Sequence, residues 1–169
     1  MPKIYRYVGP PDLLKTDTLP ERFLINAPPD VSRWIRETHQ KRGPDGGFVA
    51  TFVIDTMSEL WIADRRSEHI HCARHGDVLS AGEITFALEK EAVSVSAVTN
   101  QSTGFCPEPA SWAVVRTALN AIGLDAPDDF TTAFDFRRCP ACGSVNIVKE
   151  GHLVCEVCGN DLPVDWNFG

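Results

Sequence analysis

Four of the six cysteines stand in two close pairs near the end of the chain. Each pair has the spacing Cys-x2-Cys, twelve residues separate the two pairs, and a glycine follows each pair. Four thiolates at this spacing complete a tetrahedral shell around one zinc ion and leave no position for water. The sequence therefore predicts one structural Zn²⁺ bound by Cys139, Cys142, Cys155 and Cys158.

Residues 137–163 resemble the zinc-ribbon family, including the ribbon of transcription initiation factor B and the rubredoxin-like fold. The resemblance is carried by the four cysteines, by the first knuckle Cys-Pro-x-Cys-Gly and by Gly151, four residues before Cys155. It implies a small metal-bound ribbon, with zinc as the expected ion and iron as the alternative found in rubredoxin-type proteins. Lys149 and Glu150 are the charged residues between the knuckles, so the resemblance predicts no strong contact with polymerase or nucleic acid.

The rest of the sequence indicates a reducing compartment. Residues 1–6 contain no continuous apolar run of the kind that secretory signals have. The longest apolar stretch, residues 48–54, is far shorter than the roughly 20 residues of a membrane span. We therefore expect a cytoplasmic protein without membrane association, in which paired cysteines bind metal rather than form disulfides.

The net charge of −7 is unevenly distributed along the chain. Residues 1–42 carry an excess of basic groups, whereas residues 43–136 carry fourteen acidic and five basic groups. An acidic protein disfavours strong non-specific binding to nucleic acid or anionic lipid, since both need basic surface. The basic first segment leaves a local contact open.

Hydrophobic periodicity in residues 1–136 predicts an α+β body with a mostly antiparallel sheet and two helices. Strands are expected at residues 48–54, 59–63, 81–88 and 92–98, and helices at residues 30–42 and 109–122, with Asp30 as the first N-cap. The proline-rich residues 1–29 are expected to form extended segments and turns.

A last strand, residues 130–138, leads directly into the first cysteine pair. No Gly/Ser linker separates the two, and the apolar residues of the C-terminal tail alternate. We therefore predict two domains, a body of residues 1–136 and a zinc ribbon of residues 137–169 whose tail packs on that body.

Residues 65–77 contain three of the five histidines. In an extended segment His69 and His71 would share one face, away from Glu68. This arrangement predicts either a metal half-site completed by His75 or Asp77 or the lining of a ligand pocket, and the alternative is a polar turn.

A second polar run, residues 99–103, precedes the second predicted helix. Loops of this kind aim amide and hydroxyl groups at one point, which suits an anionic or amide-bearing ligand. Its candidate pocket residues are Asn100, Gln101, Ser102 and Thr103. Cys106 is a candidate nucleophile if the nearby helix start lowers its thiol pKa. The alternative is a loop that satisfies its own backbone around a buried cysteine.

Three functions remain open from the sequence. The first is a cytosolic zinc-binding protein whose acidic body binds a partner protein or a small ligand. The second is a hydrolase or transferase that uses the His/Asn/Ser/Cys pocket. The third is a transcription-linked regulator that uses the ribbon and the basic first segment. Convergence of the histidine run and the polar loop in one cleft would favour the enzyme.

Overall fold

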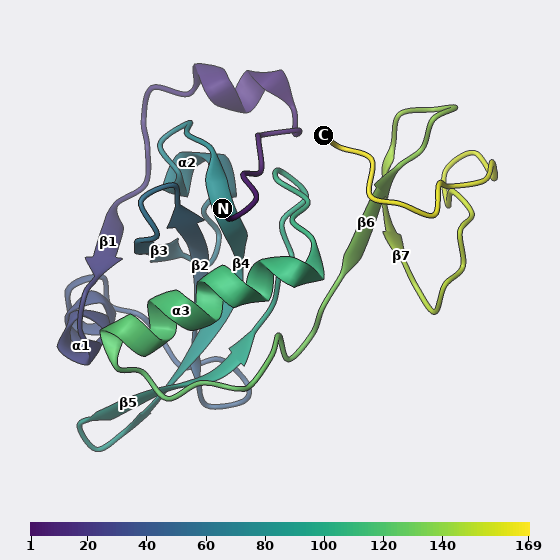
Figure 1. Cartoon of the computed structure of the whole chain (residues 1–169). Coiled ribbons are helices and arrows are strands. Elements are labelled where there is room, and N and C mark those ends of the chain that lie inside the picture. The colour runs from purple at the N-terminus through teal and green to yellow at the C-terminus, as the bar shows by residue number, and fades with distance from the viewer.

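The computed structural model describes residues 1–169 and contains a five-stranded sheet, three α-helices and a separate two-stranded hairpin (Figure 1). The strands of the sheet are β1 (Arg22–Ile25), β2 (Phe48–Asp55), β3 (Leu60–Asp64), β4 (Val78–Glu89) and β5 (Ala92–Val98). The helices are α1 (Pro28–Glu37), α2 (His69–Cys72) and α3 (Trp112–Ile122), and β6 (Asp135–Arg138) and β7 (Val145–Val148) form the hairpin. The predicted α+β class is confirmed. None of the helices has the length and apolar character needed to cross a bilayer.

The sheet has the order β1-β3-β2-β4-β5, and every neighbouring pair is antiparallel. The four strands from β2 to β5 are rich in β-branched and aromatic residues, which favour a pleated and half-buried surface. The first strand is an addition to the prediction, because residues 1–29 were expected to hold only extended segments and turns. β1 pairs with β3 and forms one edge of the sheet, and a short 3₁₀ turn, Pro11–Lys15, precedes it.

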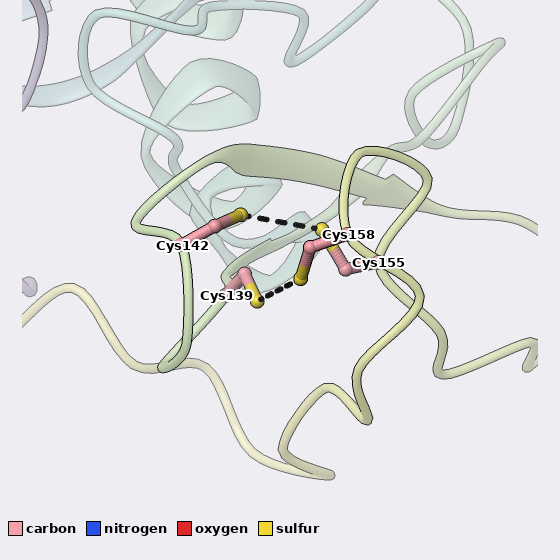
Figure 2. Close-up of side chains that lie close together, drawn as sticks. All are labelled: Cys139, Cys142, Cys155 and Cys158. Atoms are coloured by element: carbon pink, nitrogen blue, oxygen red, sulfur yellow. Dashed lines mark hydrogen bonds between the residues drawn. The ribbon is translucent and has the colours of Figure 1, made fainter.

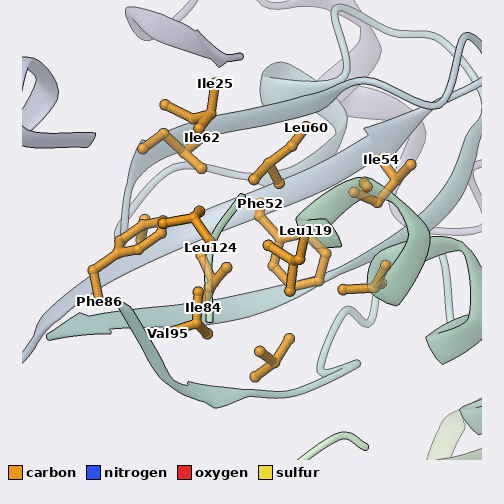
Figure 3. Packing of buried hydrophobic residues seen from close by; sticks show 14 of the residues in the cluster. Ile25, Phe52, Ile54, Leu60, Ile62, Ile84, Phe86, Val95, Leu119 and Leu124 are labelled. Carbon is orange, nitrogen blue, oxygen red and sulfur yellow. The ribbon is translucent and has the colours of Figure 1, made fainter. Parts of the chain in front are cut away.

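The two faces of the sheet are covered differently. Helices α1 and α3 pack on one face around a core of 21 buried residues, in which Phe52 and Leu119 are among the fully buried side chains (Figure 3). Successive strand residues point to opposite faces, so Val53 belongs to a second cluster of eight buried residues on the other side. Helix α2 contributes Ile70 and Cys72 to that second cluster.

The first helix differs from the prediction at both ends. It begins at Pro28 rather than after Asp30, because the Asp30 carboxylate accepts hydrogen bonds from the backbone amides of Asn26 and Ala27 at 2.8 and 3.0 Å. It ends at Glu37, and the chain then turns through the left-handed region at His39, whose φ is 53°. Asp30 is therefore a first-turn acceptor and not the N-cap residue.

The predicted last strand is shorter than expected, since only Asp135–Arg138 pair with β7. Phe130 instead packs in the main core, and the Thr131 amide donates to the Val98 carbonyl at 2.8 Å. The segment before β6 is thus attached to the body beside β5.

The C-terminal tail returns to the body near the N-terminal segment (Figure 1). The Trp166 ring meets the Tyr5 ring edge to face, with centroids 5.7 Å apart, and the Trp166 indole donates to the Cys106 carbonyl at 2.7 Å. The Arg138 guanidinium donates to the Val8 carbonyl at 3.2 Å. Residues 137–169, hereafter the cysteine segment, therefore contact the body through side-chain and backbone groups.

Candidate metal centre and polar pocket

The two cysteine pairs adopt the same turn. The Gly143 amide donates to the Cys139 carbonyl at 2.9 Å, and the Gly159 amide donates to the Cys155 carbonyl at the same distance. Both glycines lie in the left-handed region, with φ of 78° and 79°, which residues with a Cβ adopt less readily. The glycine after each Cys-x2-Cys pair is what lets the backbone turn around the sulfurs.

The four cysteine sulfurs lie together between these turns. All four ligand atoms are within 4.8 Å of one another, with 3.5 Å between the sulfurs of Cys139 and Cys158 and 3.7 Å between those of Cys142 and Cys155 (Figure 2). A tetrahedral site with Zn–S bonds of about 2.3 Å has sulfurs about 3.8 Å apart. A disulfide would need about 2.05 Å, and all six cysteines are free. The four cysteines are positioned to bind a metal ion.

Hydrogen-bond donors surround the sulfurs of the second pair. The backbone amide of Cys158 and the side-chain amide of Asn146 favour the Cys155 thiolate and lower the pKa of Cys155 to about 6. The side-chain amide of Asn160, 3.1 Å from the Cys158 sulfur, lowers the pKa of Cys158. These donors stabilise the thiolate, which is the form that binds metal.

In the first pair, the surroundings of Cys139 disfavour its negatively charged thiolate form. The backbone amide of Cys142 favours the Cys139 thiolate, but burial and the neighbouring Cys158 thiol raise the pKa of Cys139 to about 11. A divalent cation between the sulfurs favours all four thiolates at once, since metal binding releases their protons. The donor set therefore fits a zinc ion held in a closed shell.

The histidine run does not form the predicted extended segment. Residues 69–72 form the single turn of α2, and residues two apart on a helix do not face each other. His69 Nε2 lies 2.9 Å from the Gly82 carbonyl, whereas His71 Nε2 lies 2.8 Å from the Leu13 carbonyl. The predicted shared face of His69 and His71 is wrong, and with it the paired metal half-site.

The remaining groups of the run take separate positions. Because His69 Nε2 donates its proton to a carbonyl, His69 keeps Nδ1 as an acceptor, and burial lowers its pKa. His75 is exposed in the turn after α2, with its ring centroid 5.9 Å from that of His71. Glu68 is exposed directly before α2.

Two residues of the loop that follows β5, residues 99–106 and hereafter the polar loop, hold this loop together. The buried Asn100 amide donates to the Pro107 and Phe134 carbonyls at 2.9 Å each, and its oxygen accepts from the Phe134 amide at 2.7 Å. Ser102 is also buried, and its hydroxyl accepts from the Phe105 amide. Asn100 has no group left for a ligand, because the protein itself uses its donors and its acceptor.

Cys106 has the opposite of the predicted reactivity. It is fully buried, its thiol donates to the Thr103 carbonyl at 3.4 Å, and burial raises its pKa to about 12. A thiol in such surroundings stays protonated, so its nucleophilicity is suppressed rather than enhanced. The prediction of a lowered pKa from the nearby helix start is wrong. Pro107, Glu108 and the three-residue 3₁₀ turn Pro109–Ser111 separate Cys106 from the start of α3, which explains why the helix has little influence on this thiol.

A polar pocket lies where the histidine run meets the polar loop. It has a volume of about 310 Å³, and none of its lining residues is hydrophobic. The lining residues are Thr51, Arg65, Arg66, Ser67, Glu68, His69, Glu83, Gln101, Ser102 and Thr103. Five of the eight residues predicted for a pocket are among them, whereas His71, His75 and Asn100 lie outside, as does Cys106. We call this depression the polar pocket.

Sequence reasoning missed the strand residues of this pocket. Thr51 and Glu83 are register partners in β2 and β4, on the sheet face that also carries Ala81. The alternation of β4 contained the signal, because Ile84 points into the main core and Glu83 must then face the other way. Glu83 is charged, so the second apolar cluster ends at this residue of β4.

Comparison of the chain with protein-family models, with curated proteins and with solved structures finds no match.

Proposed function

We propose that this is a zinc-binding protein in which a structural zinc ribbon supports a body that binds a small ligand or a partner. The observation that carries the proposal is the pair of matching turns that brings four cysteine sulfurs within 4.8 Å. A shell of four thiolates has no open position for water or substrate, so the role of the metal is structural. When bound, the ion supplies a cross-link between the two knuckles.

Residues on both sides of the metal centre extend this support into the body. The backbone of Phe134, next to β6, forms hydrogen bonds with Asn100 at the start of the polar loop. The Trp166 indole, in the tail, donates to the carbonyl of Cys106 at the other end of that loop. Both ends of the loop are thus attached to parts of the chain that flank the metal centre, and its middle residues line the polar pocket.

A binding role has more support than catalysis. Cys106 is buried, and burial raises its pKa to about 12. The side chain of Asn100 forms its hydrogen bonds with backbone groups of the protein. Cys106 and His71 both lie outside the polar pocket, so the predicted pairing of the candidate nucleophile with His71 does not form there. The pocket offers hydroxyl, amide and charged groups that can recognise a ligand.

Elemental analysis of the protein purified under reducing conditions tests the proposal. We expect one zinc per chain, and its loss in Cys142→Ser and in Cys158→Ser. Cys72→Ala is the matched control, because Cys72 is buried in the body and outside the cluster. Absence of metal, iron in place of zinc, or equal loss of zinc from the Cys72 variant would overturn the structural zinc ribbon.

A further inference from the structure

We propose that the polar pocket binds a small zwitterionic ligand, with an ammonium group held by Glu83 and a carboxylate facing Arg65. This inference deepens the binding role proposed above and rests on it. Four separate stretches of the chain supply the pocket: β2, the turn before α2, β4 and the polar loop. Their side chains set the chemistry of the ligand.

The floor of the pocket is held in place by the protein. The Thr51 hydroxyl lies 3.2 Å from the carbonyls of both Arg65 and Ser67, which positions the turn that carries them. On the opposite wall, a Cβ at Gly82 would collide with the Thr99 carbonyl, so the polar loop passes directly over β4. A site formed by residues that are already fixed binds a ligand with little ordering cost.

Glu83 gives the floor its charge. Its half-buried carboxylate forms no ion pair and accepts no hydrogen bond from another residue. A partly desolvated carboxylate in this state favours a cationic donor, because charge-assisted hydrogen bonds are the stronger ones. His69, whose Nε2 is bound to Gly82, adds a neutral acceptor to the same lining. Because the floor of the pocket offers hydrogen-bond acceptors and no cationic side chain, it selects an ammonium group.

The rim of the pocket selects the other end of the ligand. Arg65 and Arg66 are exposed there, and Arg66 is paired with Asp64 at 3.5 Å. Arg65 has no ion-pair partner, so its guanidinium is free for a carboxylate. The volume of about 310 Å³ is at the small end for ligand pockets, and the polar lining excludes apolar molecules.

Three small probes separate the contributions of the two charges. Glycylglycine carries both an ammonium and a carboxylate, glycinamide carries only the ammonium, and N-acetylglycine carries only the carboxylate. In ¹H–¹⁵N NMR titrations of the zinc-loaded protein, we expect glycylglycine to bind tightest and glycinamide more weakly. Both should shift the amides of residues 65–69, 83 and 101–103. We expect N-acetylglycine to produce no saturable shift, because the acceptors on the floor reject it.

Two substitutions assign the charges to residues. Glu83→Gln should weaken glycylglycine and glycinamide by about ten-fold or more, as expected for loss of a charged hydrogen-bond partner. Arg65→Gln should weaken glycylglycine and leave glycinamide unchanged. Glu89→Gln is the matched control, since Glu89 lies on the same strand, exposed and outside the pocket.

Several outcomes would overturn the inference: no saturable shift with glycylglycine, equal binding of N-acetylglycine, or an unchanged affinity in Glu83→Gln. Zinc content measured on the same samples separates the two proposals. A protein that holds one zinc but binds none of the probes contradicts the zwitterion site and leaves the zinc ribbon standing. Loss of zinc with retained probe binding contradicts the ribbon alone.

Discussion

The body and the cysteine segment of this chain are stabilised in different ways. The body contains clusters of 21 and eight buried residues on the two faces of one sheet. The cysteine segment contains a cluster of three, and two of these are Cys139 and Cys155 of the sulfur cluster. A segment of this length buries too little apolar surface to fold on that basis, so small modules rely on metals or disulfides. We therefore expect folding of the body to depend on apolar burial, and folding of the cysteine segment to depend on metal binding by its four sulfurs.

The largest effect should follow from removing a metal ligand. Structural zinc contributes about 10–16 kcal/mol to the folding of comparable small modules. We therefore expect Cys155→Ser, or chelation of zinc from the unaltered chain, to unfold the cysteine segment while the sheet of the body persists. In ¹H–¹⁵N NMR spectra, the amides of residues 139–162 should collapse to unfolded positions, and those of β2 and β4 should remain dispersed.

His152→Ala serves as the control, because His152 is exposed between the knuckles and lies outside the sulfur cluster. Its spectrum should match that of the unaltered chain. If the sheet of the body unfolds together with the cysteine segment on chelation, the two regions form one cooperative unit and the comparison fails.

A core substitution tests the same comparison from the other side. Phe52 is fully buried at the centre of the main core, and truncation of a buried Phe typically costs about 3–5 kcal/mol. We expect Phe52→Ala to lower the free energy of unfolding in urea by that amount and to leave one zinc per chain in the folded protein. Met57→Ala, at an exposed position, should change it little. Loss of zinc from folded Phe52→Ala would show that the metal centre depends on the core.

The sequence predicted best what local periodicity and spacing control. The paired cysteines with their glycines implied the two turns, apolar β-branched and aromatic runs identified β2 and β3, and alternation identified β4 and β5. Both signals are local, because a turn and a strand face are set by neighbouring residues. The short β1 was missed because its pairing with β3 depends on a partner far along the chain.

The errors at the candidate site have a physical cause in tertiary contacts. His69 and His71 were placed on a strand, but the segment forms a helical turn whose Ile70 and Cys72 enter the second cluster. Asn100 resembled a ligand residue, but the backbone that occupies its amide belongs to Phe134, far along the chain. Polar residues that lie close together in the sequence indicate a site. Which of them are free to bind a ligand depends on the hydrogen bonds that each forms within the folded protein.

Asn100 joins the polar loop to the chain that leads into the cysteine segment, and its substitution should show an intermediate effect. Asn100→Ala removes three hydrogen bonds and leaves the half-buried Phe134 amide without its acceptor, so we expect a loss of about 2–3 kcal/mol in unfolding free energy. Gln101→Ala, at the exposed next position, should change the free energy of unfolding by no more than about 0.5 kcal/mol. Urea unfolding followed by circular dichroism measures both variants. If the Asn100→Ala protein is stable and loses only ligand binding, Asn100 is a residue of the ligand site and not a structural one.

The smallest effect concerns the contact between the regions, at Trp166. Trp166→Phe keeps an aromatic ring beside Tyr5 but removes the indole donor to the Cys106 carbonyl and weakens the cation–π contact with Lys3, whose ammonium is 3.7 Å from the Trp166 ring. We expect this substitution to lower the free energy of unfolding of the cysteine segment by about 1 kcal/mol. Zinc release to a chelator should then be about five-fold faster. Trp61→Phe is the matched control, since it removes an indole hydrogen bond of 2.8 Å to Asp55 within the body. If both variants release zinc at the rate of the unaltered chain, Trp166 does not couple the metal centre to the polar loop. If both accelerate release equally, the stability of the body as a whole controls retention of the metal, and the two regions are less independent than their cores indicate.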